Sequence, residues 1–150
     1  MLLAIDIGNT NIHIGLWQGE WRLRWRLQTL PQKTTDEYAV LLHGLLHLEK
    51  LEFEAIREIA IASVVPALTR TFDTIARQYF RIDPLIITAA TPMNLKIDLD
   101  TPEQVGADRI ANALAAKELF GMPSIVFDFG TATNCEVISS DGVFIGGTIT

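Results

Sequence analysis

The chain has 150 residues, of which 49% are apolar and 20% charged, so it can bury a core and is about the size of one domain. Twelve Lys and Arg against 18 Asp and Glu give a net charge of −6, which argues against a nucleic-acid binder held by bulk charge. No apolar stretch approaches the roughly 20 residues of a membrane-spanning helix, and the first residues do not resemble a secretory signal. The single cysteine, Cys135, excludes an internal disulfide framework. Together these features predict a cytoplasmic protein without a membrane or nucleic-acid partner.

The first 28 residues predict three strands joined by tight turns. Residues 2–7 are almost wholly apolar, which is typical of a strand buried on both faces. A second strand is expected over 12–17. In the third, over 21–28, apolar and polar side chains alternate with the period of a half-buried strand. The core would then receive Trp21, Leu23, Trp25 and Leu27, and the solvent Arg22, Arg24, Arg26 and Gln28.

Helices and short strands alternate in the rest of the chain. Thr34 and Glu37 resemble a capping box at the start of a helix whose apolar positions continue to Leu48. Further helices are expected over 67–80 and 106–120. Strands are expected over 58–65, 85–88, 124–129 (a buried strand), 134–139 and 143–145, and a long connection over 89–105.

One motif occurs twice. Ile5-Asp6-Ile7-Gly8 and Phe127-Asp128-Phe129-Gly130 share an apolar-Asp-apolar-Gly pattern, and their aspartates are 122 residues apart, from Asp6 to Asp128. Each copy is followed by small polar residues, a strand, a glycine-containing turn and another strand. A repeat of this kind predicts a duplicated α/β architecture. Residues 1–121 would be one half, and 122–150 the opening hairpins of an incomplete second half.

An Asp-x-Gly turn at the end of a strand suits phosphate chemistry. It places a carboxylate beside backbone amides that glycine leaves accessible, and such a corner can hold phosphates and a hydrated cation. The lysine-containing phosphate loop and the G-x-G-x-x-G fingerprint are both absent. The alternative is a tight hairpin whose aspartate satisfies amides of the turn.

Three segments together resemble type III pantothenate kinases in order and spacing: 6–11 (DIGNTN), 102–112 (PEQVGADRIAN) and 128–133 (DFGTAT). The resemblance implies the actin-like, ribonuclease H-like duplicated fold of the acetate and sugar kinase, heat-shock protein and actin superfamily, with a mixed sheet flanked by helices. It also implies ATP-dependent phosphorylation of pantothenate to 4'-phosphopantothenate, the first step of coenzyme A biosynthesis. The implied ligands are ATP with Mg²⁺, pantothenate and a monovalent cation, K⁺ or NH₄⁺, and the implied assembly is a homodimer.

The same resemblance implies roles for individual residues. Asp108 would be the catalytic base, Asp128 would bind the monovalent cation, and Thr131 would belong to the second phosphate loop. Pantothenate would be contacted by Leu99, Gly106, Ala107, Asp108 and Arg109. The first phosphate loop would comprise Asp6, Ile7, Gly8, Asn9, Thr10, Asn11, Ile12 and His13. For Asp108 the alternative is a helix cap.

The chain also departs from the family pattern. Leu99 stands where a tyrosine is common, and Asn134 and Glu136 stand where threonine and aspartate are usual. Family members continue well beyond the Gly146-Gly147 pair, so we expect a truncated chain that is inactive by itself. Two other functions stay open: another small-alcohol or sugar kinase of the superfamily, or a non-catalytic accessory protein.

Three further features have simple explanations. His43 and His47 lie four residues apart on a predicted helix, but they lack the glutamate and third ligand of a zinc motif. The alternating arginines of 21–28 are typical of a solvated face. Cys135 is expected to be a small buried residue.

Overall fold

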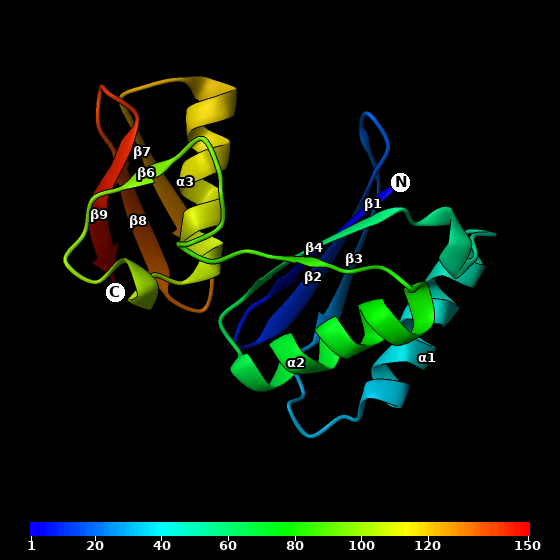
Figure 1. The fold of residues 1–150 in the computed structure, drawn as a ribbon. Coiled ribbons are helices and arrows are strands. Elements are labelled where there is room, and N and C mark those ends of the chain that lie inside the picture. Colours follow the sequence, from blue (N-terminus) through cyan, green and yellow to red (C-terminus); the bar gives the residue numbers. More distant parts are fainter. The chain divides into compact units, whose positions relative to one another are not determined.

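Two β-sheets, each with its own helical cover, organise the chain in the computed structural model, which describes all 150 residues (Figure 1). The first sheet lies within Met1–Ile86, here called the first unit, and the second within Ile87–Thr150, the second unit. No helix in either unit is both long enough and apolar enough to cross a membrane.

The sheet of the first unit has five strands in the order β3-β2-β1-β4-β5. Their bounds are β1 Leu2–Ile7, β2 Asn11–Trp17, β3 Trp21–Gln28, β4 Glu58–Ser63 and β5 Leu85–Ile86. The first three are consecutive antiparallel hairpins, as the sequence predicts. β4 pairs in parallel with β1, and β5 in parallel with β4, so β1 lies at the centre.

Helices α1 (Thr35–Leu48) and α2 (Pro66–Ile75) cover one face of this sheet (Figure 1). The predicted capping box is confirmed, since Thr34 Oγ1 accepts from the Glu37 amide and the Glu37 carboxylate accepts from the Thr34 amide. The chain continues from α2 through a π-helical turn, η2 (Ala76–Phe80). Alternate residues of β1 and β2 point into the core beneath the helices: Leu3, Ile5, Ile7, Ile12, Ile14 and Leu16. Residues 2–7 are therefore fully buried on one face only.

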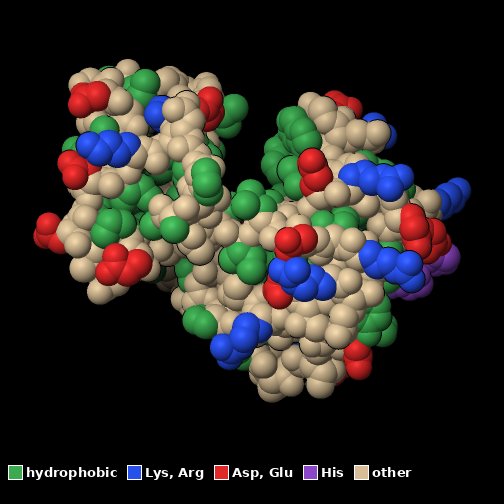
Figure 2. Space-filling model, in the orientation of Figure 1, with side chains coloured by type: hydrophobic (Ala, Val, Ile, Leu, Met, Phe, Trp, Pro, Cys, Tyr) green, Lys and Arg blue, Asp and Glu red, His purple; other side chains and the backbone are tan.

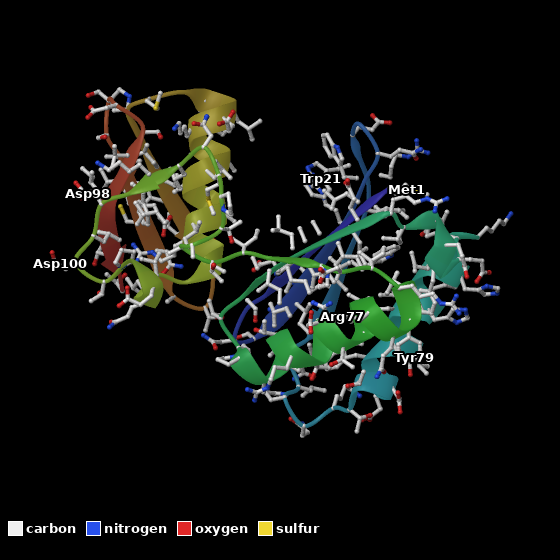
Figure 3. All side chains as sticks on the ribbon, in the orientation of Figure 1. Met1, Trp21, Arg77, Tyr79, Asp98 and Asp100 are labelled. Carbon is white, nitrogen blue, oxygen red and sulfur yellow. The ribbon has the colours of Figure 1, made fainter.

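The start of the chain is tied into this unit. The Met1 ammonium donates to the Ala55 carbonyl at 3.3 Å, and the Arg57 amide donates to the Met1 carbonyl at 2.8 Å. Figure 3 labels Met1 at the beginning of β1. Ala55 belongs to the short 3-10 helix η1 (Phe53–Ala55), which precedes β4.

The sheet of the second unit has four strands in the order β6-β9-β8-β7. Their bounds are β6 Lys96–Ile97, β7 Ser124–Phe129, β8 Thr133–Ile138 and β9 Val143–Ile149. β7, β8 and β9 are consecutive antiparallel hairpins, whereas β6 pairs in parallel with β9. Helix α3 (Ala107–Phe120) packs on one face, where a small core gathers: Leu95, Ile110, Ala113, Ala116, Ile138 and Phe144.

Three expectations about the second sheet and its surroundings are wrong in detail. β7 is not buried: Ile125, Phe127 and Phe129 are exposed because no element of the second unit packs on that face of the edge strand. The connection over 89–105 is not structureless, since it contains β6 and the 3-10 helix η3 (Pro102–Gln104). β9 extends to Ile149, four residues beyond its expected end.

Trp21 lies on the opposite face of the first sheet from the one its spacing predicts. A register shift between Leu16 and Trp17 interrupts the alternation, and the Trp21 ring packs over Gly15 and edge-on against Trp17. Its side chain is half exposed at the β2–β3 hairpin, where Figure 3 labels it. Leu23, Trp25 and Leu27 do pack against the core, and the alternating arginines are exposed, as expected.

The compact units divide the chain at a different place from the repeat. The predicted halves, 1–121 and 122–150, separate the two Asp-x-Gly motifs by sequence. By packing, however, α3 belongs with β7 and β8, because Ile110 and Ala113 share a core with Ile138. The division into a first half, 1–121, and an incomplete second half, 122–150, therefore stays a prediction.

Candidate functional site

The first Asp-x-Gly motif forms a tight turn between β1 and β2. The Gly8 amide donates to the Asn11 carbonyl at 3.0 Å, and Thr29, the residue after β3, donates its hydroxyl to the Gly8 carbonyl at 2.7 Å. A Cβ at Gly8 would lie 3.2 Å from the Asn11 oxygen, so the turn leaves little room for a side chain there. The backbone of this corner is therefore fixed by contacts from three segments.

The eight predicted residues of this corner divide between surface and core. Asp6 and His13 stand opposite each other on β1 and β2, and both are exposed. Ile7 and Ile12, the next pair, are buried in the core. Asn9 and Thr10 are exposed at the tip, with Gly8 and Asn11 half-buried beside them. Polar groups and amides thus face solvent, while the isoleucines anchor the turn.

The second Asp-x-Gly motif forms a similar turn between β7 and β8. The Gly130 amide donates to the Ala132 carbonyl at 3.1 Å, and Thr131 is exposed at the tip. Phe129 pairs with Thr133 here, whereas Ile7 pairs with Ile12 in the first unit, so the second turn is one residue shorter. The repeat is therefore present in the structure, with a shorter second loop.

The motif Gly106-Ala107-Asp108-Arg109 opens α3. Gly106 is the N-cap residue, Ala107 is buried, and the half-buried Asp108 lies within the first turn. The Asp108 Oδ1 accepts from the Arg109 amide at 2.8 Å, which satisfies one free amide of the helix start. Asp108 therefore satisfies an amide of the helix start, as the capping alternative expects, although the N-cap residue itself is Gly106. A carboxylate there benefits from the positive end of the helix.

Asp128 is tied to the same helix. Its Oδ2 accepts from Nδ2 of Asn112 at 3.0 Å, one turn along α3 from Asp108. Asp128 is half-buried and lies opposite Asn134 on β8. Asn112 therefore links the predicted cation ligand to the helix that carries the predicted base.

Arg109 crosses to β8. Its Nε donates to Oε1 of Glu136 at 2.9 Å, and its Nη2 donates to the Cys135 carbonyl at 3.3 Å. The guanidinium carbon also lies 5.8 Å from the centre of the Phe144 ring on β9, within reach of a cation–π interaction. The Arg109 side chain is 15% exposed and that of Glu136 is fully buried.

Glu136 has an unusual electrostatic environment. Burial raises the pKa of its carboxyl, the Arg109 hydrogen bond and charge oppose that rise, and the negative charges of Asp128 and Asp108 add to it. Oε2 is buried without a hydrogen-bond partner. The second unit thus brings together Asp108, Arg109, Asn112, Asp128 and Glu136.

Leu99 is half-buried and packs against the core of the second unit. Asp98 and Asp100 on either side of it are exposed and point away from the unit (Figure 3). A leucine offers no hydroxyl where the family pattern has tyrosine, so any substrate contact at this position is apolar.

Sequence reasoning gave no role to Asn112 and noted Glu136 only as a departure from the family pattern. Asn112 stood within the recognised motif. The available signal for Glu136 is a carboxylate with an apolar neighbour on each side, Cys135 and Val137, within a predicted strand. Its partner could not be found, because Arg109 is 27 residues away on a different kind of element.

The other candidate groups lie elsewhere. Nε2 of His43 and Nδ1 of His47 each lie 3.6 Å from the Glu52 carboxylate, and Figure 2 shows histidine side chains next to carboxylates at the surface of the first unit. No cluster of three or more His, Cys, Asp or Glu side chains is arranged to hold a metal ion. Cys135 is half-buried, less buried than expected.

The chain is similar in sequence to proteins of one family. The sequence profile described as type III pantothenate kinase matches residues 2–150. Proteins named type III pantothenate kinase from Roseiflexus sp. and Thermomicrobium roseum are 52% and 47% identical over 99% of this chain, which covers 59% and 58% of their lengths. The chain thus spans about three fifths of the relatives it matches.

Two solved structures share the fold at low identity. A candidate N-acetylglucosamine kinase from Porphyromonas gingivalis is 16% identical, with a TM-score of 0.54, and is matched over 99% of this chain and 47% of its own. A candidate 2-dehydro-3-deoxygalactonokinase from Sinorhizobium meliloti is 15% identical, with a TM-score of 0.56. The match covers 99% of this chain and 53% of that protein. The mixed α/β fold is thus actin-like, as expected.

Proposed function

The chain belongs to the type III pantothenate kinase family, and from that premise we propose that the protein it represents phosphorylates pantothenate with ATP. The product would be 4'-phosphopantothenate, and the reaction the first step of coenzyme A biosynthesis. The proposal is supported by the family match over residues 2–150 and by a helix start that carries Asp108 and Arg109 together.

Asp108 is the proposed catalytic base. Phosphoryl transfer requires that the acceptor hydroxyl be oriented and that its proton be removed as the bond to phosphorus forms. Asp108 uses Oδ1 for the Arg109 amide, and Oδ2 makes no hydrogen bond within the protein. Oδ2 can therefore accept the hydroxyl proton, the hydroxyl oxygen takes the γ-phosphoryl group, and ADP leaves.

The remaining acceptor contacts lie around Asp108. The half-buried Gly106 has no side chain to cover the helix start, Ala107 is buried in the first turn, and Arg109 supplies a positive charge. Leu99 would contribute an apolar contact. Arg109 and the helix N-terminus both favour an anionic group in this neighbourhood.

The two Asp-x-Gly turns are proposed to contact the phosphates of ATP, with Mg²⁺ accompanying the nucleotide. Residues 6–13 offer exposed polar side chains and backbone amides on a turn held by Thr29. Thr131 offers a hydroxyl at the tip of the second turn. Backbone amides in such turns bind phosphate oxygens.

Asp128 is the proposed ligand of a monovalent cation. A carboxylate oxygen suits a hard cation, and Oδ1 of Asp128 makes no hydrogen bond within the protein, while Asn112 orients the group through Oδ2. A cation bound there would supply positive charge near the phosphates. Activity should depend on K⁺ or NH₄⁺, and Asp128→Asn should weaken that dependence. Equal activity in Na⁺ alone would reduce Asp128 to a structural role.

The single observation that carries the proposal is Asp108 in the first turn of α3, on the family's motif. In a protein that spans the whole family length, Asp108→Asn should lower kcat by about 10²- to 10⁴-fold, with the fold intact. Asp141→Asn, in the exposed turn between β8 and β9, is the control and should leave kcat unchanged. Near-normal turnover by a folded Asp108→Asn variant would contradict the assignment.

The same assay separates the other functions. Turnover with a sugar or another small alcohol, but not with pantothenate, would favour a different kinase of the superfamily. Absence of turnover with any acceptor in the longer protein would favour an accessory role. We expect the 150-residue chain alone to show no pantothenate-dependent ATP consumption. A cytoplasmic location and a homodimer are further proposals, testable by cell fractionation and by mass measurement in solution.

A further inference from the structure

Glu136 is an unexpected residue in the core of the second unit. Its side chain is fully buried on β8, where Oε1 accepts from Arg109 and Oε2 has no hydrogen-bond partner. A buried polar atom without a partner destabilises a fold, and a buried ion pair is often no more stabilising than apolar side chains of similar size. Stability alone therefore does not account for a carboxylate at this position.

Arg109 is held at three points of the adjacent strands β8 and β9. Nε donates to Glu136, Nη2 donates to the Cys135 carbonyl, and the guanidinium lies over the Phe144 ring. A guanidinium has five N–H groups, and these contacts use two of them. The orientation of Arg109 is thus fixed on the sheet, and its other three N–H groups make no hydrogen bond within the protein.

Gly147 makes this arrangement sterically possible. It pairs with Glu136 across β8 and β9, and a Cβ at this position would lie 2.6 Å from Nη2 of Arg109. The same Cβ would collide with the Cys135 carbonyl. The guanidinium therefore lies directly against the backbone of β9, where only a glycine fits.

We propose that Glu136 is a positioning residue that holds the Arg109 guanidinium in the orientation in which its remaining N–H groups meet the substrate. This inference rests on the proposed function, in which Arg109 contacts pantothenate. Glu136 touches neither the substrate nor the reacting atoms and acts only through Arg109. Its removal should therefore weaken acceptor binding more than it slows phosphoryl transfer.

The test measures kcat and the KM values for pantothenate and ATP in a protein of full family length. Glu136→Gln keeps the size of the side chain and an acceptor oxygen but removes the charge. We expect it to raise the KM for pantothenate about 10-fold, the scale of a lost hydrogen bond between charged groups. The kcat and the KM for ATP should change less than about 3-fold. Glu136→Asp, which keeps the charge, should restore part of the loss.

The matched control is Glu118→Gln, the same substitution at an exposed position of α3. It should leave all three parameters unchanged. A double-mutant cycle then tests whether the effect passes through Arg109. In an Arg109→Ala background, Glu136→Gln should cause no further rise in the KM for pantothenate. A further rise of similar size would overturn the positioning role.

The outcomes separate this inference from the proposed function. If Arg109→Ala leaves the KM for pantothenate unchanged, Arg109 does not bind the acceptor and both proposals fail at this site. If Arg109→Ala raises that KM and Glu136→Gln does not, only the positioning role fails. Should Glu136→Gln not fold, NMR of the unsubstituted protein decides. Slow solvent exchange of the Arg109 Nε–H supports the contact, and free exchange overturns it.

Discussion

Each unit contains three consecutive antiparallel strands with a similar Asp-x-Gly turn between the first two, yet the two units bury those strands very differently. β1 lies at the centre of its sheet, and Leu3, Ile5 and Ile7 are at most 4% exposed beneath two helices. β7 is an edge strand, and Phe127 and Phe129 are 60% and 81% exposed. In both units the glycine amide of the turn donates to a carbonyl across the turn, so this closing hydrogen bond does not require a buried first strand.

The largest contrast should appear when one aromatic side chain is removed from each unit. Phe72 is 1% exposed and packs against Tyr38, so Phe72→Ala should lower the free energy of unfolding of the first unit by about 3–5 kcal/mol. Phe127→Ala should change that of the second unit by less than about 0.5 kcal/mol. Denaturant unfolding of the 150-residue chain measures both. A large loss for Phe127→Ala would mean that its face is covered in solution.

Amide hydrogen exchange should be about 100-fold or more slower in β1 than in β7. Amides of β1 are enclosed by β2 and β4, whereas β7 pairs only with β8 and lies over a smaller core. Exchange measured by mass spectrometry on a dilute monomer gives both rates at once. Equal protection of β7 and β1 would contradict the contrast and would point to a stabilising contact on the exposed face.

Replacing one glycine in each unit by alanine should change the free energy of unfolding in opposite directions. Gly147→Ala would collide with the Cys135 carbonyl, so it should lower the free energy of unfolding by about 1–3 kcal/mol or more. Gly44 lies within α1 with open space around its Cα, so Gly44→Ala should raise that free energy by about 0.5–1 kcal/mol. Thermal unfolding of the two variants provides the comparison. A stabilised Gly147→Ala would show that β9 can move away from β8.

The smallest expected effect is a pH dependence specific to the second unit. Because burial raises the pKa of Glu136, the folded state holds this proton more tightly than the unfolded state does. The protonated Glu136 carboxyl therefore stabilises the folded state below about pH 4.5, the ordinary pKa of a glutamate. This contribution is lost as the pH rises through the higher pKa that Glu136 has in the folded state. Glu136→Gln should therefore gain stability relative to the unsubstituted protein from pH 4 to pH 7. A parallel pair of stability curves would contradict this assignment.

The elements set by local sequence could be predicted, and those set by distant contacts could not. The capping box of Thr34 and Glu37 and the three opening strands depend on residues close in the chain. The two-residue strand β6 exists only because β9, nearly 50 residues later, pairs with it. Trp21 lies on the other face from the one its spacing predicts, because a register shift between β2 and β3 breaks an alternation that looks regular in β3 alone.

The candidate site shows the same division. Asp6, Asp108 and Asp128 stand in motifs that the sequence displays, and the structure places Asp108 at a helix start, as predicted. The hydrogen bonds from Asn112 to Asp128 and from Arg109 to Glu136 join α3 to β7 and β8. The hydrophobic periodicity of the sequence cannot predict these hydrogen bonds, because they depend on the orientation of α3 relative to the strands on which it packs.

The parallel pairing of β1 with β4 has a consequence for synthesis on the ribosome. Leu2 pairs with Glu58, so the strand that emerges first lacks one neighbour until more than 50 further residues have been made. The β1–β2–β3 hairpins need only adjacent segments and can form early, whereas the edge of β1 that receives β4 stays open meanwhile.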